Sequence, residues 1–231
     1  MKIICIIPAR GGSKRIPRKN IRQFCGKPII AYSIEAALNS GLFDEVMVST
    51  DDEEIAAIAR QYGANVPFLR SAETANDYAT TDDVLKEVLA EYQKRGKTFD
   101  VMCCIYPCAP LITVKRLRQC LEKLNDSPAE VVFPMVQFPS APQRGFTYKD
   151  GLLVRVQPEL TYVRTQDIPK VYYDPGQFYF FDIPAFHAKS GIDRIYEMVE
   201  VSSFEVQDVD SPEDWKLAEL KYELIHNGEF V

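Results

Sequence analysis

The chain has 231 residues, 46% of them hydrophobic, and a formal net charge of -6. This length suits one α/β domain with an elaboration, and the acidic balance argues against a protein that binds nucleic acid through a broad basic surface. No apolar run approaches the roughly 20 residues that a membrane-spanning helix needs, and the first run is too short for a secretory signal. We therefore expect a cytoplasmic protein without nucleic-acid or membrane partners.

The chain opens with a predicted buried strand over residues 2–7 and, directly after it, a basic loop over residues 8–20. The loop, PARGGSKRIPRKN, contains five cations and no acid. Gly11 and Gly12 can adopt backbone angles closed to other residues and let main-chain N–H groups approach an anion. Ligands of open α/β sheets bind outside the carboxyl ends of the strands, where this loop lies. Its spacing fits neither a Walker A loop nor a dinucleotide fingerprint, so the alternatives are a different polyphosphate site and a solvated basic turn.

Further along the chain, strands alternate with helices. We predict helices over residues 29–41, 53–62, 82–94 and 114–124, and strands over residues 44–50, 66–69 and 100–106. Pro107 and Pro110 follow the last of these strands and force a loop there. The alternation predicts an α/β fold with a doubly wound, mostly parallel sheet.

The middle of the chain changes to a strand-like pattern over residues 130–156. Asp150-Gly151 stands between β-prone segments and predicts a hairpin. We interpret residues 133–170 as a β arm inserted into a single domain of residues 1–231. A two-stranded ribbon is marginally stable alone, so we expect the arm to pack on a second subunit or over the active site. Strands over residues 177–181 and 196–202 and a helix over residues 211–226 complete the predicted fold.

Two carboxylates at positions i and i+2, Asp208 and Asp210, form a second candidate site. In an extended segment both side chains project to the same side and can share one divalent cation. The alternative role is helix capping, but Ser211 and Asp214 already supply the N-cap and an acid at the third helical position. The pair therefore predicts a Mg²⁺ site. Together with the basic loop, it indicates metal-assisted transfer of a nucleotidyl or phosphoryl group.

Several further positions are ambiguous from the residues alone. Asp51 and Asp52 close the second strand, where they could contact a ribose, a base or a metal, or only complement a helix dipole. Arg70 could pair with a phosphate or with a base. Thr80 and Thr81 are equally suited to cap the helix that follows them.

Four segments, in chain order, resemble the motifs of the sialic acid cytidylyltransferases, the CMP-acylneuraminate synthetase family. They are PARGGSKRIPRKNI at the start, VSTDDEEIA, RSAETANDYATTDDVL and the closing DVDSPEDW. The resemblance implies a fold similar to that of nucleotide-diphospho-sugar transferases, a homodimer formed through the inserted arm, and the use of CTP and Mg²⁺. It also implies the reaction, in which CMP is joined to the anomeric hydroxyl of a nine-carbon 2-keto sugar acid and pyrophosphate is released.

The same resemblance assigns roles to individual residues. CTP would be bound by Arg10, Gly11, Gly12, Ser13, Lys14, Lys19, Asn20, Arg70 and Thr81. Catalysis would depend on Arg10, Lys19, Asp208 and Asp210, the last two as ligands of Mg²⁺. The sugar hydroxyl would attack the α-phosphorus in line, while the basic loop meets the charge of the departing pyrophosphate. Arg164 matches an arginine that receives the sugar carboxylate, a planar group that suits a guanidinium fork.

Two departures from the family pattern concern the sugar. Tyr106 stands where sialic acid enzymes typically have a glutamine, and Gly176-Gln177-Phe178-Tyr179 resembles the signature of pseudaminic acid cytidylyltransferases. We therefore expect pseudaminic acid as the substrate, with Tyr106, Arg164, Gln177 and Phe178 in the sugar site. The alternatives are the same reaction on N-acetylneuraminate or legionaminate and, from a different class, a non-catalytic nucleotide sensor.

Overall fold

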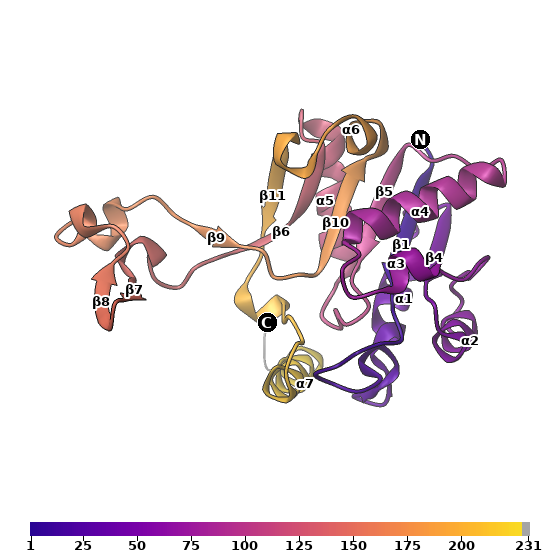
Figure 1. Cartoon of the computed structure of the whole chain (residues 1–231), viewed down its shortest axis with the longest axis horizontal. Coiled ribbons are helices and arrows are strands. Elements are labelled where there is room, and N and C mark those ends of the chain that lie inside the picture. Colours follow the sequence, from indigo (N-terminus) through magenta and orange to yellow (C-terminus); the bar gives the residue numbers. More distant parts are fainter. Residues whose placement is uncertain (228–231) are drawn as a thin grey trace.

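The computed structural model describes residues 1–227 (Figure 1), so the last four positions of the predicted domain lie outside the described residues. The strands are β1 (Ile3–Pro8), β2 (Gln23–Phe24), β3 (Lys27–Pro28), β4 (Glu45–Ser49), β5 (Val101–Ile105), β6 (Val131–Gln137), β7 (Phe146–Lys149), β8 (Leu152–Arg155), β9 (Tyr172–Tyr173), β10 (Phe178–Asp182) and β11 (Tyr196–Glu200). The helices are α1 (Ile29–Ser40), α2 (Glu53–Gln61), α3 (Ala72–Ala75), α4 (Thr81–Lys94), α5 (Val114–Asp126), α6 (Ile183–Ala188) and α7 (Pro212–His226). None of the helices described is both long enough and apolar enough to cross a membrane.

The central sheet is mixed. Its strand order is β11-β6-β10-β5-β1-β4, and β9 pairs with the carboxyl end of β6. β1 lies parallel to β4 and β5, and β11 lies parallel to β6, whereas β10 runs antiparallel to both β5 and β6. The chain leaves the sheet along β6 and returns along β9 and β10, so these strands resemble the two sides of a long hairpin. The predicted α/β fold class is confirmed, with β10 as an antiparallel member of the sheet.

Alternate side chains of the sheet are buried on two faces. Ile3, Cys5 and Ile7 of β1 share a cluster with residues of α1, α2 and α5, whereas Ile4 and Ile6 share one with residues of α4 and α6. Because helices cover both faces, the inner strands are apolar throughout. Burial raises the pKa of the Cys5 thiol well above its ordinary value, which agrees with a structural cysteine.

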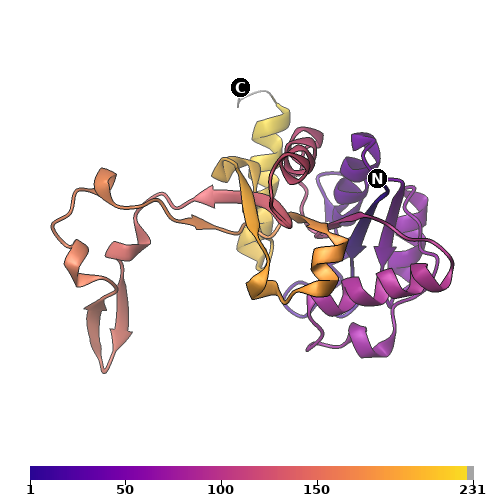
Figure 2. The same cartoon turned by 90° about the horizontal axis from the view of Figure 1, so that it is seen from above.

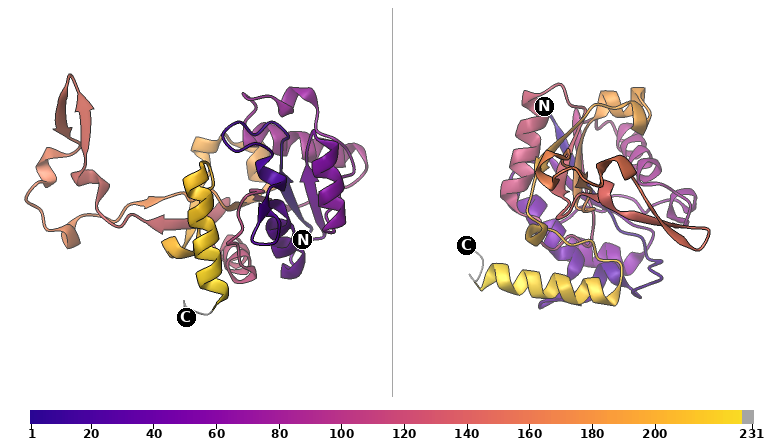
Figure 3. Two further views of the ribbon diagram at one scale, coloured as in Figure 1. Left: turned by 90° about the horizontal axis from the view of Figure 1, so that it is seen from below. Right: turned by 90° about the vertical axis from the view of Figure 1, so that its left-hand side faces the viewer.

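Helix α7 packs against the segment that follows the basic loop (Figure 3). Phe24 and Trp215 belong to one buried cluster, and their ring centroids lie 5.5 Å apart. Ser211 caps the helix in a capping box with Asp214, as predicted. Residues 208–210 directly precede this capped helix, so its packing holds them beside the basic loop.

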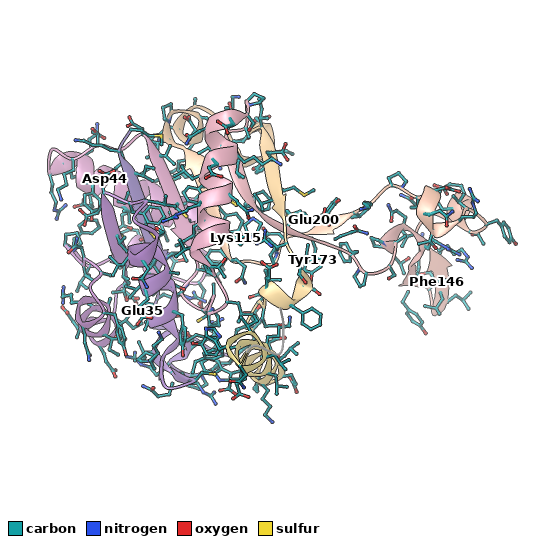
Figure 4. All side chains as sticks on the ribbon, turned by 180° about the vertical axis from the view of Figure 1, so that it is seen from behind. Glu35, Asp44, Lys115, Phe146, Tyr173 and Glu200 are labelled. Atoms are coloured by element: carbon teal, nitrogen blue, oxygen red, sulfur yellow. The ribbon has the colours of Figure 1, made fainter. Side chains whose placement is uncertain are left out.

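An arm projects from the body between β6 and β9 (Figures 1 and 2). Its far end carries the hairpin β7–β8, and the predicted Asp150-Gly151 turn is confirmed, with φ of 51° and 79°. Tyr173 and Glu200 lie where the arm meets the body, and Phe146 lies near its far end (Figure 4). Large apolar side chains exposed on the arm include Phe146, Tyr148, Leu152, Leu153 and Tyr162. Residues 133–137, which we assigned to the arm, belong to β6, where they pair with β11 and β9.

The strand predicted over residues 66–69 is wrong. In the described chain, a single bridge forms between β4 and Asn65. Pro67 has no N–H to donate to a ladder, which explains why the pairing stops. The segment still follows β4, because the Arg70 N–H donates a 2.8 Å hydrogen bond to the Thr50 carbonyl.

Candidate active site

A cleft of about 500 Å³ opens at the carboxyl ends of β1 and β5. Both strands lead directly into its walls, since Pro8 ends β1 and Tyr106 follows β5. The cleft is lined by Pro8, Arg10, Ser13, Lys14, Arg15, Ile16, Lys19, Asn20, Tyr106, Pro107, Cys108, Gly176, Asp208 and Asp210. The basic loop and the acid pair therefore face a common cavity, at the edge of the sheet where ligands of α/β proteins bind.

One carboxylate holds two cations of the basic loop. Arg10 Nη1 lies 2.8 Å from Asp77 Oδ1, and Lys14 Nζ pairs with the other oxygen, Oδ2. These cations lower the pKa of Asp77, with the hydrogen bond from Lys14 as the largest cause. Arg18 differs from them, because it pairs with Asp52 at the start of α2 and does not line the cleft.

Internal hydrogen bonds hold the basic loop in place. Asn20, only 5% exposed, donates from Nδ2 to the Arg10 carbonyl at 2.9 Å, and its Oδ1 accepts a 3.2 Å hydrogen bond from the Cys108 thiol. The Gly11 N–H donates to Asp51 Oδ1 at 2.9 Å. The side-chain nitrogen and oxygen of Asn20 therefore both form hydrogen bonds inside the protein. In the structure, this predicted CTP ligand holds the basic loop in place.

The two loop glycines do not adopt the left-handed backbone angles that only glycine readily takes. Neither Gly11 nor Gly12 has a positive φ. Gly11 is instead confined by space, since a Cβ there would lie 2.8 Å from Asp52 Oδ2, whereas a Cβ at Gly12 would meet nothing within 4 Å. Asp52 is the N-cap of α2 and accepts two of its first backbone N–H groups. Asp52 therefore has a role at the start of α2, which is the structural one of the alternatives given for it.

Asp208 and Asp210 both line the cleft, whereas Val209 between them is buried in the α7 cluster. The arrangement predicted from the i, i+2 spacing is therefore present. Asp210 Oδ1 lies 2.8 Å from Arg15 Nη2 and 3.4 Å from Lys19 Nζ. Desolvation and, after it, the charge of Asp210 raise the pKa of Asp208. No group of three or more His, Cys, Asp or Glu side chains suited to a metal occurs among residues 1–227, so a cation here would have two carboxylates from the protein.

A second cavity, of about 240 Å³, adjoins the cleft and shares Arg10 and Tyr106 with it. Arg70 lines this cavity from a buried position. Its Nε donates to Ser49 Oγ at 3.0 Å and its Nη2 to the Ser49 carbonyl at 2.6 Å. Burial lowers the pKa of Arg70, and the guanidinium is fixed to the end of β4. The structure therefore brings the two arginines predicted for CTP to connected cavities.

The ambiguity between two neighbouring threonines is resolved. Thr80 caps α4 in a capping box with Asp83, whereas the Thr81 hydroxyl lies 3.3 Å from the Tyr106 hydroxyl. Thr81 and Tyr106 both line the second cavity, and Tyr106 also lines the cleft. Tyr106 therefore stands at the junction of the two cavities, close to the predicted nucleotide site.

Gln177 and Phe178, which we expected in the sugar site, do not reach the cleft. Gln177 is 2% exposed and donates to the carbonyls of Pro175 and Gln207 at 3.0 and 3.2 Å. Phe178 is buried in the core beneath α1 and α5. Neither side chain lines the cleft. Gln177 instead ties the start of β10 to the segment that precedes Asp208.

The residue of β10 that approaches the junction is Tyr179, which the sequence analysis missed. Its ring centroid lies 5.5 Å from that of Tyr106, and its hydroxyl lies 2.9 Å from both oxygens of Asp174. Burial and the charge of Asp174 raise the pKa of Tyr179, so it stays a hydrogen-bond donor at neutral pH. Period-two alternation along β10 was the available signal, because Tyr179 points to the opposite face from Phe178.

Arg164 is not brought to the cleft of its own chain. It lies on the arm, its side chain is 74% exposed, and its Nε pairs with Asp167 Oδ2 at 2.7 Å. The arm projects away from the body, as Figure 2 shows. A role for Arg164 in sugar binding therefore requires a second copy of the chain.

In a comparison with known proteins, the family described as "Cytidylyltransferase" matches residues 4–221 of this chain. The chain belongs to the cytidylyltransferase family. This cytidylyltransferase is 41% identical to the pseudaminic acid cytidylyltransferase of Campylobacter jejuni, with 100% of both chains covered. It is 33% identical to the CMP-N,N'-diacetyllegionaminic acid synthase of Legionella pneumophila, with 97% of both chains covered.

The fold of the cytidylyltransferase is also similar to a solved structure. The TM-score is 0.73 against CMP:2-keto-3-deoxy-manno-octonic acid synthetase in complex with CTP, over 98% of this chain and 100% of that chain. At 20% identity this similarity shows the fold alone. The predicted family, fold class and enzyme class are confirmed, whereas the roles of individual site residues stay predictions.

Proposed function

We propose that this cytidylyltransferase joins CMP from CTP to pseudaminic acid and releases pyrophosphate. The observation that carries the proposal is one cleft in which cations of the basic loop face Asp208 and Asp210. This arrangement suits a reaction in which phosphate charge is held on one side while a hydroxyl is brought to the α-phosphorus from the other. The choice of sugar rests on the similarity over the whole length to the Campylobacter jejuni protein.

The basic loop would hold the triphosphate. Arg10, Lys14 and Lys19 line the cleft, and Lys19 Nζ also donates a 2.7 Å hydrogen bond to the Val209 carbonyl. Lys19 therefore lies between the phosphate side and the acid pair. Cations fixed in this way stabilise the charge that develops on the departing pyrophosphate, without reorganising during the reaction.

Asp208 and Asp210 suit a hard divalent cation, because they offer carboxylate oxygens on one side of an extended segment. A bound Mg²⁺ would lower the pKa of the attacking hydroxyl and neutralise phosphate charge. Mg²⁺ usually keeps several waters and takes further oxygens from substrate phosphates, so two protein carboxylates meet its needs. Arg15 and Lys19 pair with Asp210 Oδ1 and would orient this carboxylate.

The second cavity would take the base and the ribose of CTP. It shares Arg10 with the cleft, so a nucleotide that spans both cavities would place its phosphates at the basic loop. Arg70 offers a guanidinium that is already fixed to Ser49, and a fixed donor loses little entropy on binding. Thr81 adds a hydroxyl on the same wall.

The sugar acid would lie beside Tyr106, with Asp174 and Tyr179 at the edge of its site. Its carboxylate would be received by Arg164 from the arm of a second copy, so that the working enzyme is a homodimer. Two observations support this arrangement: the exposed guanidinium of Arg164 and the large apolar side chains exposed on the same arm. Apolar surface of this kind on a projecting ribbon suits an interface between subunits.

A substrate panel tests the proposal. Pseudaminic, legionaminic and N-acetylneuraminic acids would each be incubated with CTP and Mg²⁺, and the CMP-sugar and pyrophosphate measured by mass spectrometry and a coupled assay. Fastest turnover with pseudaminic acid is expected. Faster turnover with legionaminic acid would favour the other relative described above. CTP binding without pyrophosphate release on any sugar acid would indicate a nucleotide sensor.

A further inference from the structure

We propose that Asp77 competes with the phosphates of the nucleotide for Arg10 and Lys14, so that CTP must displace it in order to bind. The inference rests on the proposed function, because it takes the cleft as the triphosphate site. Its starting point is a long-range contact: Asp77 holds Arg10 and Lys14, which lie 67 and 63 positions away in the chain. A side chain that pairs with two cations of the basic loop can limit their binding to phosphate groups.

The geometry of this contact resembles the binding of a phosphate group. Each oxygen of the Asp77 carboxylate takes one cation, as two oxygens of a phosphate would. The contact also lies at the junction of the two cavities, because Arg10 lines both, Lys14 lines the cleft and Asp77 lines the second cavity. A nucleotide that spans the cavities passes this junction, so Asp77 and the phosphates cannot hold the same donors together.

The ion pairs of Asp77 with Arg10 and Lys14 are weak enough for a nucleotide to displace Asp77. The side chains of Arg10, Lys14 and Asp77 are 40%, 75% and 47% exposed, and ion pairs in contact with water contribute little individually. A ligand with several phosphates carries more charge than one carboxylate and would take the cations from it. The pyrophosphate part of CTP would displace it, whereas CMP, which lacks that part, would bind without displacing it. Asp77 would therefore weaken the binding of CTP and pyrophosphate, and it would return to the cations when pyrophosphate leaves.

The segment around Asp77 can move without disturbing the fold. It connects α3 to α4 without regular structure and is shaped by a local turn, in which Asn76 Oδ1 accepts the N–H groups of Tyr78 and Ala79 at 2.7 and 3.0 Å. Thr80 begins the capping box directly after it, so the helix is anchored independently. Tyr78 is 94% exposed, which leaves room around the turn.

The test measures binding of CTP, inorganic pyrophosphate and CMP to the full-length wild type and Asp77→Asn by calorimetry, without sugar acid. We expect Asp77→Asn to bind CTP and pyrophosphate about three- to tenfold more tightly at low ionic strength, with a smaller gain at high salt. CMP binding should change by less than about twofold. Asp126→Asn is the matched control, since it removes one exposed acid of α5 that lines neither cavity.

A double-mutant cycle ties the effect to the contact. In a Lys14→Gln background, the gain from Asp77→Asn should shrink, because one of the two cations is already lost. Weaker or unchanged CTP binding by Asp77→Asn would overturn the inference and leave the proposed function intact, since Asp77 would then position the cations or be neutral. Failure of the wild type to bind CTP or pyrophosphate would overturn the proposed function and the inference together.

Discussion

The Cys108 thiol donates a 3.2 Å hydrogen bond to the amide oxygen of Asn20, a residue 88 positions away in the chain. Asn20 in turn donates to the Arg10 carbonyl, so one short path of hydrogen bonds joins the loop after β5 to the basic loop. Burial raises the pKa of Cys108 to about 12, and the thiol therefore keeps its proton at neutral pH. The contact gives Cys108 a role in the shape of the cleft.

The first prediction follows from that contact. Cys108→Ala should loosen Asn20 and raise the KM for CTP about three- to tenfold, as expected for the loss of one buried hydrogen bond. Cys108→Ser keeps a donor and should stay within about twofold of the wild type. Steady-state kinetics with CTP varied at saturating sugar acid measure both. An unchanged KM for CTP in Cys108→Ala, with normal thermal unfolding, would show that the hydrogen bond between Cys108 and Asn20 does not affect CTP binding.

The second prediction concerns the acid pair. Asp208→Asn should lower metal-dependent turnover by at least about 100-fold, because the carboxylate that would bind the cation is lost. CTP binding, measured by calorimetry without a metal, should be largely retained. Removal of divalent cations from the wild type with a chelator should reproduce the loss, and addition of Mg²⁺ should reverse it. An Asp208→Asn enzyme with wild-type turnover would exclude this residue as a metal ligand.

The third prediction rests on the position of Arg164, which lies on the arm and outside the cleft of its own chain. Arg164→Ala should raise the KM for the sugar acid at least about tenfold, with CTP binding unaltered, because a carboxylate loses its guanidinium partner. Arg164→Ala and Asp208→Asn subunits, each inactive alone at low substrate, should regain up to about a quarter of wild-type activity when refolded together, since mixed dimers contain one intact site. No recovery in mixtures shown to contain mixed dimers would contradict sharing of the site between subunits.

The fourth prediction concerns stability and its dependence on pH. Arg116 holds Glu205 through two hydrogen bonds of 2.6 and 2.7 Å, which join α5 to the segment after β11, and it lowers the pKa of Glu205. A carboxylate with a lowered folded pKa stabilises the fold above its unfolded pKa, and that stability is lost as pH falls through the folded value.

Glu205→Gln should therefore lower the free energy of unfolding by about 1 kcal/mol at neutral pH, and by much less at about pH 3. Urea unfolding at the two pH values measures the difference, with Glu122→Gln on the exposed face of α5 as the control. A loss of stability that is the same at both pH values would indicate altered packing in place of the lost ion pair.

Features with a local signature could be predicted from the sequence. The hairpin at Asp150-Gly151 follows from the turn residues, and the start of α7 follows from Ser211 and Asp214. The basic loop and the acid pair were also identified separately, because charge and spacing marked each one. The position of the loop after β1 was then enough to place it at the carboxyl edge of the sheet.

The features that could not be predicted from the sequence are those that depend on tertiary contacts. Gln177 and Phe178 were assigned to the sugar site because they belong to a recognisable motif, but the pleat of β10 turns Phe178 to the core and Tyr179 to the junction. The contact between Asp77 and Lys14 spans 63 positions and has no local pattern. The antiparallel direction of β10 likewise depends on a connection through the arm, which hydrophobic periodicity does not reveal.

The arm and the proposed sugar site share one short piece of backbone. β9, at Tyr172–Tyr173, ends the arm. Asp174, which accepts a hydrogen bond from Tyr179, and Gly176, which lines the cleft, follow within a few positions. In the proposed homodimer, a shift in the way two copies associate would be transmitted along this backbone to the groups proposed to surround the sugar. Among relatives, exchange of one arm for another is therefore expected to alter substrate preference even when every residue of the cleft is preserved.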